Sequence, residues 1–157
     1  MNKTLIAFFS ASGVTESVAR VLSGALDADL HEISPAVRYT DADLDWRNPN
    51  SRSSLEMKNP ASRPEITDTP VNIADYDTIL LGFPIWWYVA PTIVNTFLEK
   101  HDFTGKKIVL FATSGGSDFG KTADSLKASV PGATIAEGML QRGKQDLDAW
   151  TAWAQTC

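Results

Sequence analysis

Three separate runs of apolar residues place the strongest constraint on how this chain can fold. They cover residues 5–9, 78–83 and 107–112, and each contains at most one polar side chain. Strands that are covered by helices on both faces of a parallel sheet are apolar throughout, whereas half-exposed strands alternate. Each run is followed by a segment with apolar residues at helical spacing. The pattern therefore predicts an α/β fold.

The order of the remaining segments extends this prediction. Four helices and two weaker strands complete an alternation of the two element types. The predicted helices cover residues 14–26, 92–100, 121–130 and 145–154, and the weaker strands cover residues 29–33 and 133–136. Alternating strands and helices form a parallel sheet between two helical layers. The sequence thus predicts a doubly wound five-stranded parallel sheet with helices on both faces, and its 157 residues fit a single domain over residues 1–157.

One stretch, at about residues 38–70, does not follow the alternation, and we call it the excursion. Its basic and acidic side chains are interleaved, and it holds four prolines, namely Pro49, Pro60, Pro64 and Pro70. We expect a short helix at residues 41–46 and otherwise an ordered surface segment, because apolar side chains such as Trp46 and Leu55 can be buried there. A disordered segment is the alternative.

Composition and charge exclude several classes of protein. With 43% hydrophobic and 21% charged residues, the chain is neither disordered nor a disulfide scaffold. A net charge of -5 argues against binding of nucleic acid through a basic surface. The ~20 consecutive apolar residues of a membrane helix are missing, and Gly13 interrupts the N-terminal apolar run too early for a signal peptide. The single cysteine, Cys157, cannot form an internal disulfide. We therefore expect a cytoplasmic protein that binds neither nucleic acid nor a membrane.

The first loop, residues 10–15, joins the first predicted strand to the first helix and is a candidate anion site. Hydroxyls and backbone N–H groups converge there on a helix N-terminus, which favours a phosphate. Capping of the helix by Ser12 or Thr15 is the alternative. The loop has neither the Lys-Ser/Thr pair of a Walker motif nor three spaced glycines, so a mononucleotide is favoured over NAD. The candidate residues are Ser10, Ala11, Ser12, Gly13, Val14 and Thr15.

The second loop, residues 84–91, follows the second apolar run and contains three consecutive aromatic residues between two prolines. We expect one of Trp86 and Trp87 to lie in the core and the other to form a wall for a flat ring. The candidate residues in this loop are Pro84, Ile85, Trp86 and Trp87.

The third loop, residues 113–120, follows the third apolar run and contains three glycines, which let backbone amides approach a ligand closely. A flexible loop with a helix cap at Ser117 or Asp118 is the alternative. Loops that leave the central strands of such a sheet meet at its ligand-binding edge. The candidate residues are Thr113, Ser114, Gly115, Gly116, Phe119 and Gly120.

Metal binding and nucleophilic catalysis find little support in the sequence. His31 and His101 are far apart in the chain, and Cys157 is terminal, so there is no zinc-binding spacing. No Gly-x-Ser-x-Gly motif is present. We expect both histidines to lie on the surface, and we assign neither a metal ligand nor a catalytic residue.

The three loops resemble those of the flavodoxin family. The sequence Ser-Ala-Ser-Gly-Val-Thr of the first loop resembles the family's phosphate loop, commonly Thr/Ser-x-Thr/Ser-Gly-x-Thr. Residues 82–87 with Pro91, and residues 113–116, resemble the two loops that face the flavin ring. The resemblance implies the strand order 2-1-3-4-5 and bound FMN, with its phosphate on the first loop and its ring between the other two. It also implies that hydroxyls of Ser10, Ser12 and Thr15 and backbone amides of Gly13 and Val14 hold the phosphate.

Two departures from the electron-carrier flavodoxins indicate an enzyme. Carriers commonly have a glycine in the first ring loop, whose peptide turns toward the reduced flavin, and residues 84–91 contain none. The third loop offers only Phe119 for stacking, which leaves one ring face open to a second flat molecule.

The resemblance therefore implies an FMN-dependent oxidoreductase that passes two electrons from NAD(P)H to a quinone or similar acceptor. The excursion would close over the site, with Arg47, Arg52 and Arg63 as donors to an anionic substrate. A solvated loop is the alternative for the excursion. A one-electron carrier between redox proteins and a flavin-free binding module are the alternatives for the function.

Overall fold

The computed structural model describes residues 3–157, and its centre is a sheet of five parallel strands. The strands are β1 (Thr4–Phe8), β2 (Asp29–Glu32), β3 (Thr78–Pro84), β4 (Lys107–Ser114) and β5 (Thr134–Arg142). Their order across the sheet is β2-β1-β3-β4-β5. In the central register Ile6 lies beside Leu80, and Leu80 lies beside Val109. The predicted sheet and its strand order are confirmed.

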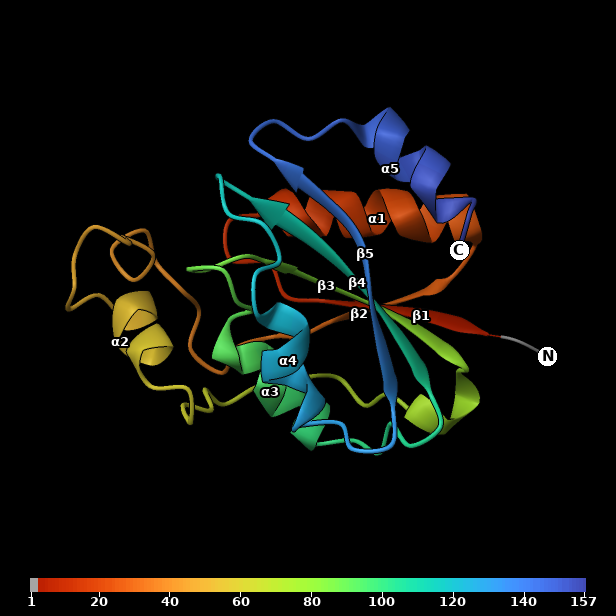
Figure 1. Ribbon diagram of the computed structural model, residues 1–157, viewed down its shortest axis with the longest axis horizontal. Helices are drawn as coiled ribbons and strands as arrows, with labels where there is room; N and C mark the ends of the chain where they lie inside the picture. The colour runs from red at the N-terminus through yellow and green to blue at the C-terminus, as the bar shows by residue number, and fades with distance from the viewer. Residues whose placement is uncertain (1–2) are drawn as a thin grey trace.

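Helices cover both faces of this sheet (Figure 1). Helices α1 (Val14–Leu26) and α5 (Leu147–Ala154) pack against each other on one face, while α3 (Thr92–Glu99) and α4 (Thr122–Lys127) lie on the other. The prediction for α1 is confirmed at both of its ends. Among residues 3–157 the structure has no helix whose length and apolar character would allow it to cross a lipid bilayer.

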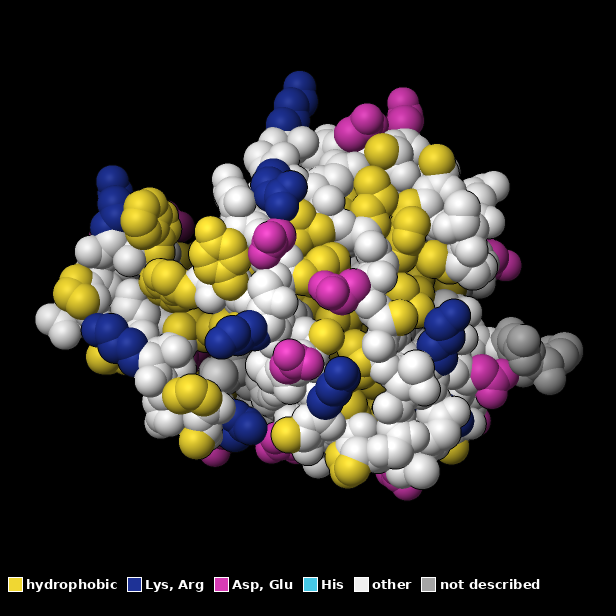
Figure 2. Space-filling model, viewed as in Figure 1, with side chains coloured by type: hydrophobic (Ala, Val, Ile, Leu, Met, Phe, Trp, Pro, Cys, Tyr) yellow, Lys and Arg dark blue, Asp and Glu magenta, His cyan; other side chains and the backbone are white. Residues whose placement is uncertain are grey.

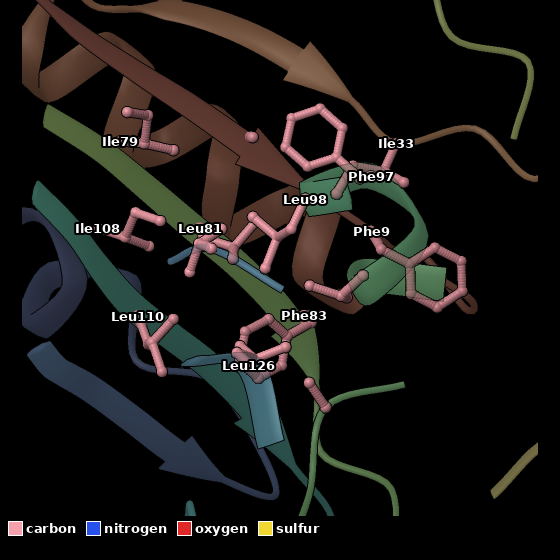
Figure 3. Packing of buried hydrophobic residues seen from close by; sticks show 14 of the residues in the cluster. Phe9, Ile33, Ile79, Leu81, Phe83, Phe97, Leu98, Ile108, Leu110 and Leu126 are labelled. Atoms are coloured by element: carbon pink, nitrogen blue, oxygen red, sulfur yellow. The ribbon is translucent and has the colours of Figure 1, made fainter. Parts of the chain in front are cut away.

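The two helical layers explain why the central strands are apolar throughout. Alternate residues of β1 point to opposite faces, so that Ile6 joins the core beneath α1 and α5 while Leu5 joins the core beneath α3. Figure 3 shows the second of these cores, which contains Leu81 of β3, Ile108 of β4 and Phe97 of α3. Each fully buried side chain of this size contributes roughly 1.5–3 kcal/mol of transfer free energy. Burial on both faces therefore dictates the uninterrupted apolar runs.

The last strand is longer than predicted. Residues 133–136 were expected to form it, but β5 continues to Arg142. The partner of Leu110 is Glu137 and that of Phe111 is Met139, so Gly138 forms a bulge that carries the strand onward. Glu137 and Gly138 interrupt the apolar pattern, so the sequence does not predict that the strand continues past residue 136.

The excursion lies beyond the carboxyl ends of the strands, with α2 (Arg52–Lys58) at its outer end (Figure 1). The predicted helix at residues 41–46 is wrong, because turns occupy that stretch. The Thr40 N–H donates to the Asp43 carboxylate, and the Asp43 N–H donates to the Thr40 hydroxyl. Such local side-chain bonds compete with helix formation. The helix begins instead after Ser51, whose hydroxyl accepts a bond from the Ser54 N–H.

Candidate functional site

The first loop leaves the N-terminus of α1 open to solvent. Gly13 stands at the N-cap with a φ of 95°, a left-handed conformation that suits glycine, and no side chain caps the helix. The Ser10 hydroxyl accepts a hydrogen bond from the Gly13 N–H at 3.1 Å. Ser12 and Val14 are exposed. Because neither Ser12 nor Thr15 caps the helix, its first N–H groups remain available for an anion, and the capping alternative is wrong.

Thr15 and Thr113 join the three loops to one another. The two buried hydroxyls form a hydrogen bond of 2.8 Å, and the Thr113 carbonyl accepts a bond from the Ile85 N–H at 2.9 Å. Two hydroxyls carry two hydrogens, and their mutual bond uses one. The pair therefore fixes the relative positions of the loops and keeps one hydrogen for a further acceptor.

The second loop makes a tight turn with two residues in an unusual backbone conformation. Trp86 and Val89 exchange backbone hydrogen bonds of 3.0 and 3.2 Å, which leaves Trp87 and Tyr88 at the tip. These two residues have φ values of 51° and 64°. Left-handed conformations cost residues other than glycine about 1–2 kcal/mol each. Strain of this kind is concentrated at functional sites.

The two tryptophans of this loop have different surroundings. Trp86 packs edge-on against Phe9 and Tyr39, with ring centroids 5.9 and 5.6 Å apart. Trp87 is 44% exposed. The structure thus places Trp86 toward the interior and leaves Trp87 open to a ligand.

The third loop holds the turn of the second loop in place. The Tyr88 carbonyl accepts a bond of 3.1 Å from the Lys121 N–H. Gly120 has a φ of 52°, and a Cβ atom at this position would lie 2.5 Å from the Tyr88 carbonyl oxygen. Gly115 and Gly116 are exposed, so their backbone remains accessible. Close approach of the two loops therefore requires a glycine at position 120.

A large cavity of about 760 Å³ lies between the second loop, the third loop and the excursion. It is lined from the second loop by residues 85–88, from the third loop by residues 114–117, and from the excursion by Leu44, Trp46 and Ser53. A volume of this size and walls of aromatic side chains and exposed backbone suit a flat, largely apolar ring. We call this the large cavity.

The structure brings only some of the predicted site residues into the large cavity. Those that line it are Ile85, Trp86, Trp87, Ser114, Gly115 and Gly116. Ser10 and Ala11 line a separate cavity of about 390 Å³. Phe119 packs against the core instead, while Pro84 and Gly120 support the loops without lining the large cavity. Sequence reasoning missed Tyr88 and Ser117 within the two loops, and it missed the excursion residues because their position depends on contacts between distant segments.

Two of the three arginines expected to bind substrate stabilise the excursion instead. The Arg52 guanidinium stacks 3.8 Å from the centre of the Tyr39 ring, donates to Glu56 at 3.0 Å and donates to the Val37 carbonyl at 2.7 Å. Arg63 donates to both carboxylate oxygens of Glu99 in α3, at 2.9 and 3.0 Å. These contacts correct the expectation that both arginines face a ligand.

The interior of the excursion also perturbs a titratable group. The Tyr39 hydroxyl donates to the Glu56 carboxylate at 2.5 Å. Burial, followed by this bond to Glu56, raises the pKa of Tyr39 well above its ordinary value. Tyr39 therefore stays neutral and serves as a fixed packing surface for Arg52 and Trp86.

Arg47 differs from the other two arginines because 76% of its side chain is exposed. It lines a second cavity, of about 460 Å³, together with Trp46, Lys58 and Trp87. Among residues 3–157 no acidic side chain lines this cavity, although the Asp45 carboxylate lies 3.5 Å from the Arg47 Nε atom and the chain as a whole has a net charge of -5. Figure 2 shows hydrophobic and basic side chains close together on this part of the surface. We call this the basic cavity, and its walls Trp46 and Trp87 also border the large cavity.

A comparison with known families agrees with this arrangement of loops. A family model described as flavodoxin matches residues 3–157. The chain belongs to the flavodoxin family. A search of curated proteins gives no match.

Solved structures similar to this chain extend the comparison. A protein of Bacteroides eggerthii, named provisionally as a flavoprotein, is 47% identical, with a TM-score of 0.88 and coverage of 99% of this chain and 98% of the other. A protein of Bacteroides uniformis, named in the same way, is 44% identical, with a TM-score of 0.90 and coverage of 98% of both chains. A Lactobacillus acidophilus flavoprotein in complex with FMN is 22% identical, with a TM-score of 0.69 and coverage of 96% and 99%, and it shows the shared fold.

The histidines of this chain correct one further expectation. His31 is buried rather than on the surface, and its Nε2 lies 2.8 Å from the Asp68 carboxylate. Its ring stacks on Phe97, which also contacts His101. Burial, and then the nearby His31, lower the pKa of His101. Among residues 3–157 there is no group of three or more side chains that could hold a metal ion.

Proposed function

We propose that this chain binds FMN, with the phosphate on the first loop and the ring in the large cavity. The observation that carries the proposal is the uncapped N-terminus of α1, where the backbone N–H groups that follow Gly13 have no side-chain cap, in the loop that also carries the hydroxyls of Ser10 and Ser12. A phosphate dianion satisfies such a donor set. Membership of the flavodoxin family and the FMN complex of the Lactobacillus acidophilus protein support the same cofactor.

The residues present fit a flavin ring as well as a phosphate. Trp87 offers an exposed aromatic face on one side of the large cavity, and the backbone of Gly115 and Gly116 is accessible on another. The hydroxyl pair of Thr15 and Thr113 ties the phosphate loop to the loops of the ring. FMN, when bound, supplies the capacity to accept and release electrons, and the chain supplies binding, orientation and exclusion of water.

The chain acts, in this proposal, as an oxidoreductase that passes two electrons from a nicotinamide dinucleotide to a quinone or similar flat acceptor. Support comes from the basic cavity, which shares the walls Trp46 and Trp87 with the large cavity. Aromatic walls suit a flat substrate, and Arg47 and Lys58 suit the negative charge of a dinucleotide phosphate or an anionic acceptor. A second substrate can therefore bind directly beside the ring.

The turn at Trp87 and Tyr88 supports the transfer of electrons in pairs. Rotation of the peptide between these residues would leave Trp87 with a positive φ and an extended ψ, a combination open essentially only to glycine. This strain at Trp87, on the order of 1–3 kcal/mol, opposes the rotation, although the rotation would relieve the left-handed conformation of Tyr88. In this proposal the peptide keeps its present orientation when the cofactor binds, held by the two backbone hydrogen bonds between Trp86 and Val89.

Steady-state oxidation of NADPH and NADH by the FMN-loaded protein, with a quinone as acceptor, tests the proposed activity. Turnover is expected, and the double variant Arg47→Ala/Lys58→Ala should raise the KM of the anionic substrate several-fold while leaving FMN bound. Stepwise anaerobic reduction should pass from yellow to colourless with little blue absorbance. A protein that is inert to both nicotinamides and accumulates a persistent blue form is a one-electron carrier instead. A chain that takes up no FMN refutes both functions.

A further inference from the structure

The basic cavity adjoins a third cavity, of about 500 Å³, between the excursion and helices α3 and α4 (Figure 1). Met57 of the excursion and Val89 of the second loop line both of them. The basic cavity in turn shares Trp46 and Trp87 with the large cavity. Each neighbouring pair of cavities thus has two walls in common, and the three follow one another along the excursion.

The third cavity combines apolar walls with a basic side chain that has no partner. The apolar walls are Met57, Pro60, Val89 and Ala90. Lys121, at the start of α4, is exposed, and its ammonium group forms no ion pair or hydrogen bond with the residues that the structure describes. The other charged side chains at this cavity have partners, since Arg63 binds Glu99 and Asp124 lies 3.5 Å from the Lys127 ammonium group. Lys121 is therefore the group left to bind an anion there.

The backbone of Lys121 is anchored to the turn of the second loop. Its N–H donates to the Tyr88 carbonyl at 3.1 Å, directly beside Trp87 at the tip of that turn. The contact between the two loops thus joins the third cavity to a wall of the large cavity. The position of Lys121 relative to the proposed ring site is fixed by the fold.

The basic side chains of the middle cavity also keep free donors. The Lys58 ammonium group donates to the Pro49 carbonyl at 2.8 Å, and this bond uses one of its three hydrogens. The Arg47 side chain is 76% exposed. Charge-assisted bonds from such groups to phosphate are stronger than those between neutral groups. From one end to the other, the cavities therefore offer aromatic walls, then basic donors, then apolar walls with a lysine.

We propose that a nicotinamide dinucleotide lies along these three cavities and that Lys121 makes NADPH the preferred electron donor. The nicotinamide lies beside the flavin ring, the pyrophosphate near Arg47 and Lys58, and the adenosine in the third cavity. There the apolar walls contact the flat base, and Lys121 binds the 2′-phosphate that distinguishes NADPH from NADH. This inference rests on the proposed function, and it adds the site of the adenosine half and the choice between the two donors.

Calorimetric titration of the FMN-loaded protein with two adenosine fragments tests the adenosine site without any redox step. Bound FMN occupies the first loop, so the fragments cannot bind to that anion site. Adenosine 2′,5′-bisphosphate should bind at least fivefold more tightly than 5′-AMP, which lacks the 2′-phosphate. Lys121→Met removes the charge but keeps a long apolar side chain, and it should abolish this preference without changing the affinity for 5′-AMP.

Lys100→Met is the matched control for the lost charge. Lys100 follows α3, is exposed and lines none of the three cavities. The control should keep the preference for the bisphosphate. In steady-state assays the unaltered protein should have at least a fivefold higher kcat/KM for NADPH than for NADH. Lys121→Met should lower the value for NADPH to that for NADH and leave turnover with NADH unchanged.

The outcomes separate this inference from the proposed function. If neither nicotinamide is oxidised but the bisphosphate is preferred only while Lys121 is present, the proposed activity fails and the adenosine site stands. Equal affinity of the unaltered protein for the two fragments overturns the inference, whether or not turnover is observed. A preference that survives in Lys121→Met, or one that is lost equally in Lys100→Met, also overturns it.

Discussion

The first loop and the excursion approach each other where Ser10 and Tyr39 border a common cavity, but they are built in different ways. The first loop presents backbone groups at a strand-to-helix junction, and its geometry depends on one glycine, Gly13. The excursion is held by side chains from distant segments, including the pairs Arg63–Glu99 and His31–Asp68. The difference shows that a backbone site can be recognised from a short motif, whereas a site made of side chains depends on the whole fold.

Trp86 links the excursion to the core, because its ring packs against both Phe9 and Tyr39, which also contact each other. Trp86→Ala should lower the free energy of unfolding by about 2–4 kcal/mol, somewhat less than for a fully buried tryptophan. Trp87→Ala should cost less than about 1 kcal/mol of stability but weaken flavin binding. Urea unfolding and flavin titration of both variants measure the two effects. Equal losses of stability would remove the distinction between the two side chains.

A negative charge at Ser12 tests whether the first loop is an anion site. Ser12→Glu should weaken FMN binding at least a hundredfold, about 2.7 kcal/mol, because a carboxylate replaces a donor beside the phosphate. Riboflavin, which lacks the phosphate, should lose less than threefold. Fluorescence titrations with the two flavins measure the ratio. A parallel loss for both flavins would place the phosphate elsewhere.

The variants Arg63→Ala and Arg47→Ala compare an arginine that stabilises the excursion with one that is expected to bind substrate. Arg63→Ala breaks a partly exposed ion pair with Glu99 and should lower stability by less than about 1 kcal/mol, with an unchanged KM for the nicotinamide. Arg47→Ala should leave stability unchanged and raise that KM several-fold. Thermal unfolding and initial-rate kinetics separate the two. A raised KM in Arg63→Ala alone would return that arginine to the substrate site.

The same contrast explains what the sequence could and could not predict. The sheet and helix α1 follow from patterns within short windows, since burial on both faces imposes apolar runs, whereas the strand order follows from the resemblance to the flavodoxin family. The open end of α1 at Gly13 follows from a motif of six residues. The role of Arg52 could not be predicted, because it depends on which carbonyls and carboxylates other segments bring near. His31 was misassigned for the same reason, since its partner Asp68 lies 37 positions away.

The histidines give the smallest expected effect, a dependence of stability on pH. The pKa of His101 is lowered below its ordinary value of 6.5, because burial and His31 disfavour the charged ring, although Asp68 acts in the opposite direction. The unfolded chain therefore binds the proton more readily, and stability should decline as the pH falls from about 7 to about 5. The pKa of Glu99 is also lowered, chiefly by its bond to Arg63, but it acts only below its ordinary value of 4.5. Chemical unfolding across this range should show the decline, and His101→Gln should abolish it between pH 5 and 7. An unchanged profile in that variant would assign the decline to other groups.

The most direct test of the account is a titration of the flavin-free protein with FMN and with riboflavin, followed by quenching of tryptophan and flavin fluorescence. A phosphate held by charge-assisted hydrogen bonds at the N-terminus of α1 contributes roughly 1.5–3 kcal/mol for each bond. The account predicts that FMN binds at a ratio of one per chain and at least tenfold more tightly than riboflavin. Equal affinity for the two flavins, or binding of neither, would contradict it.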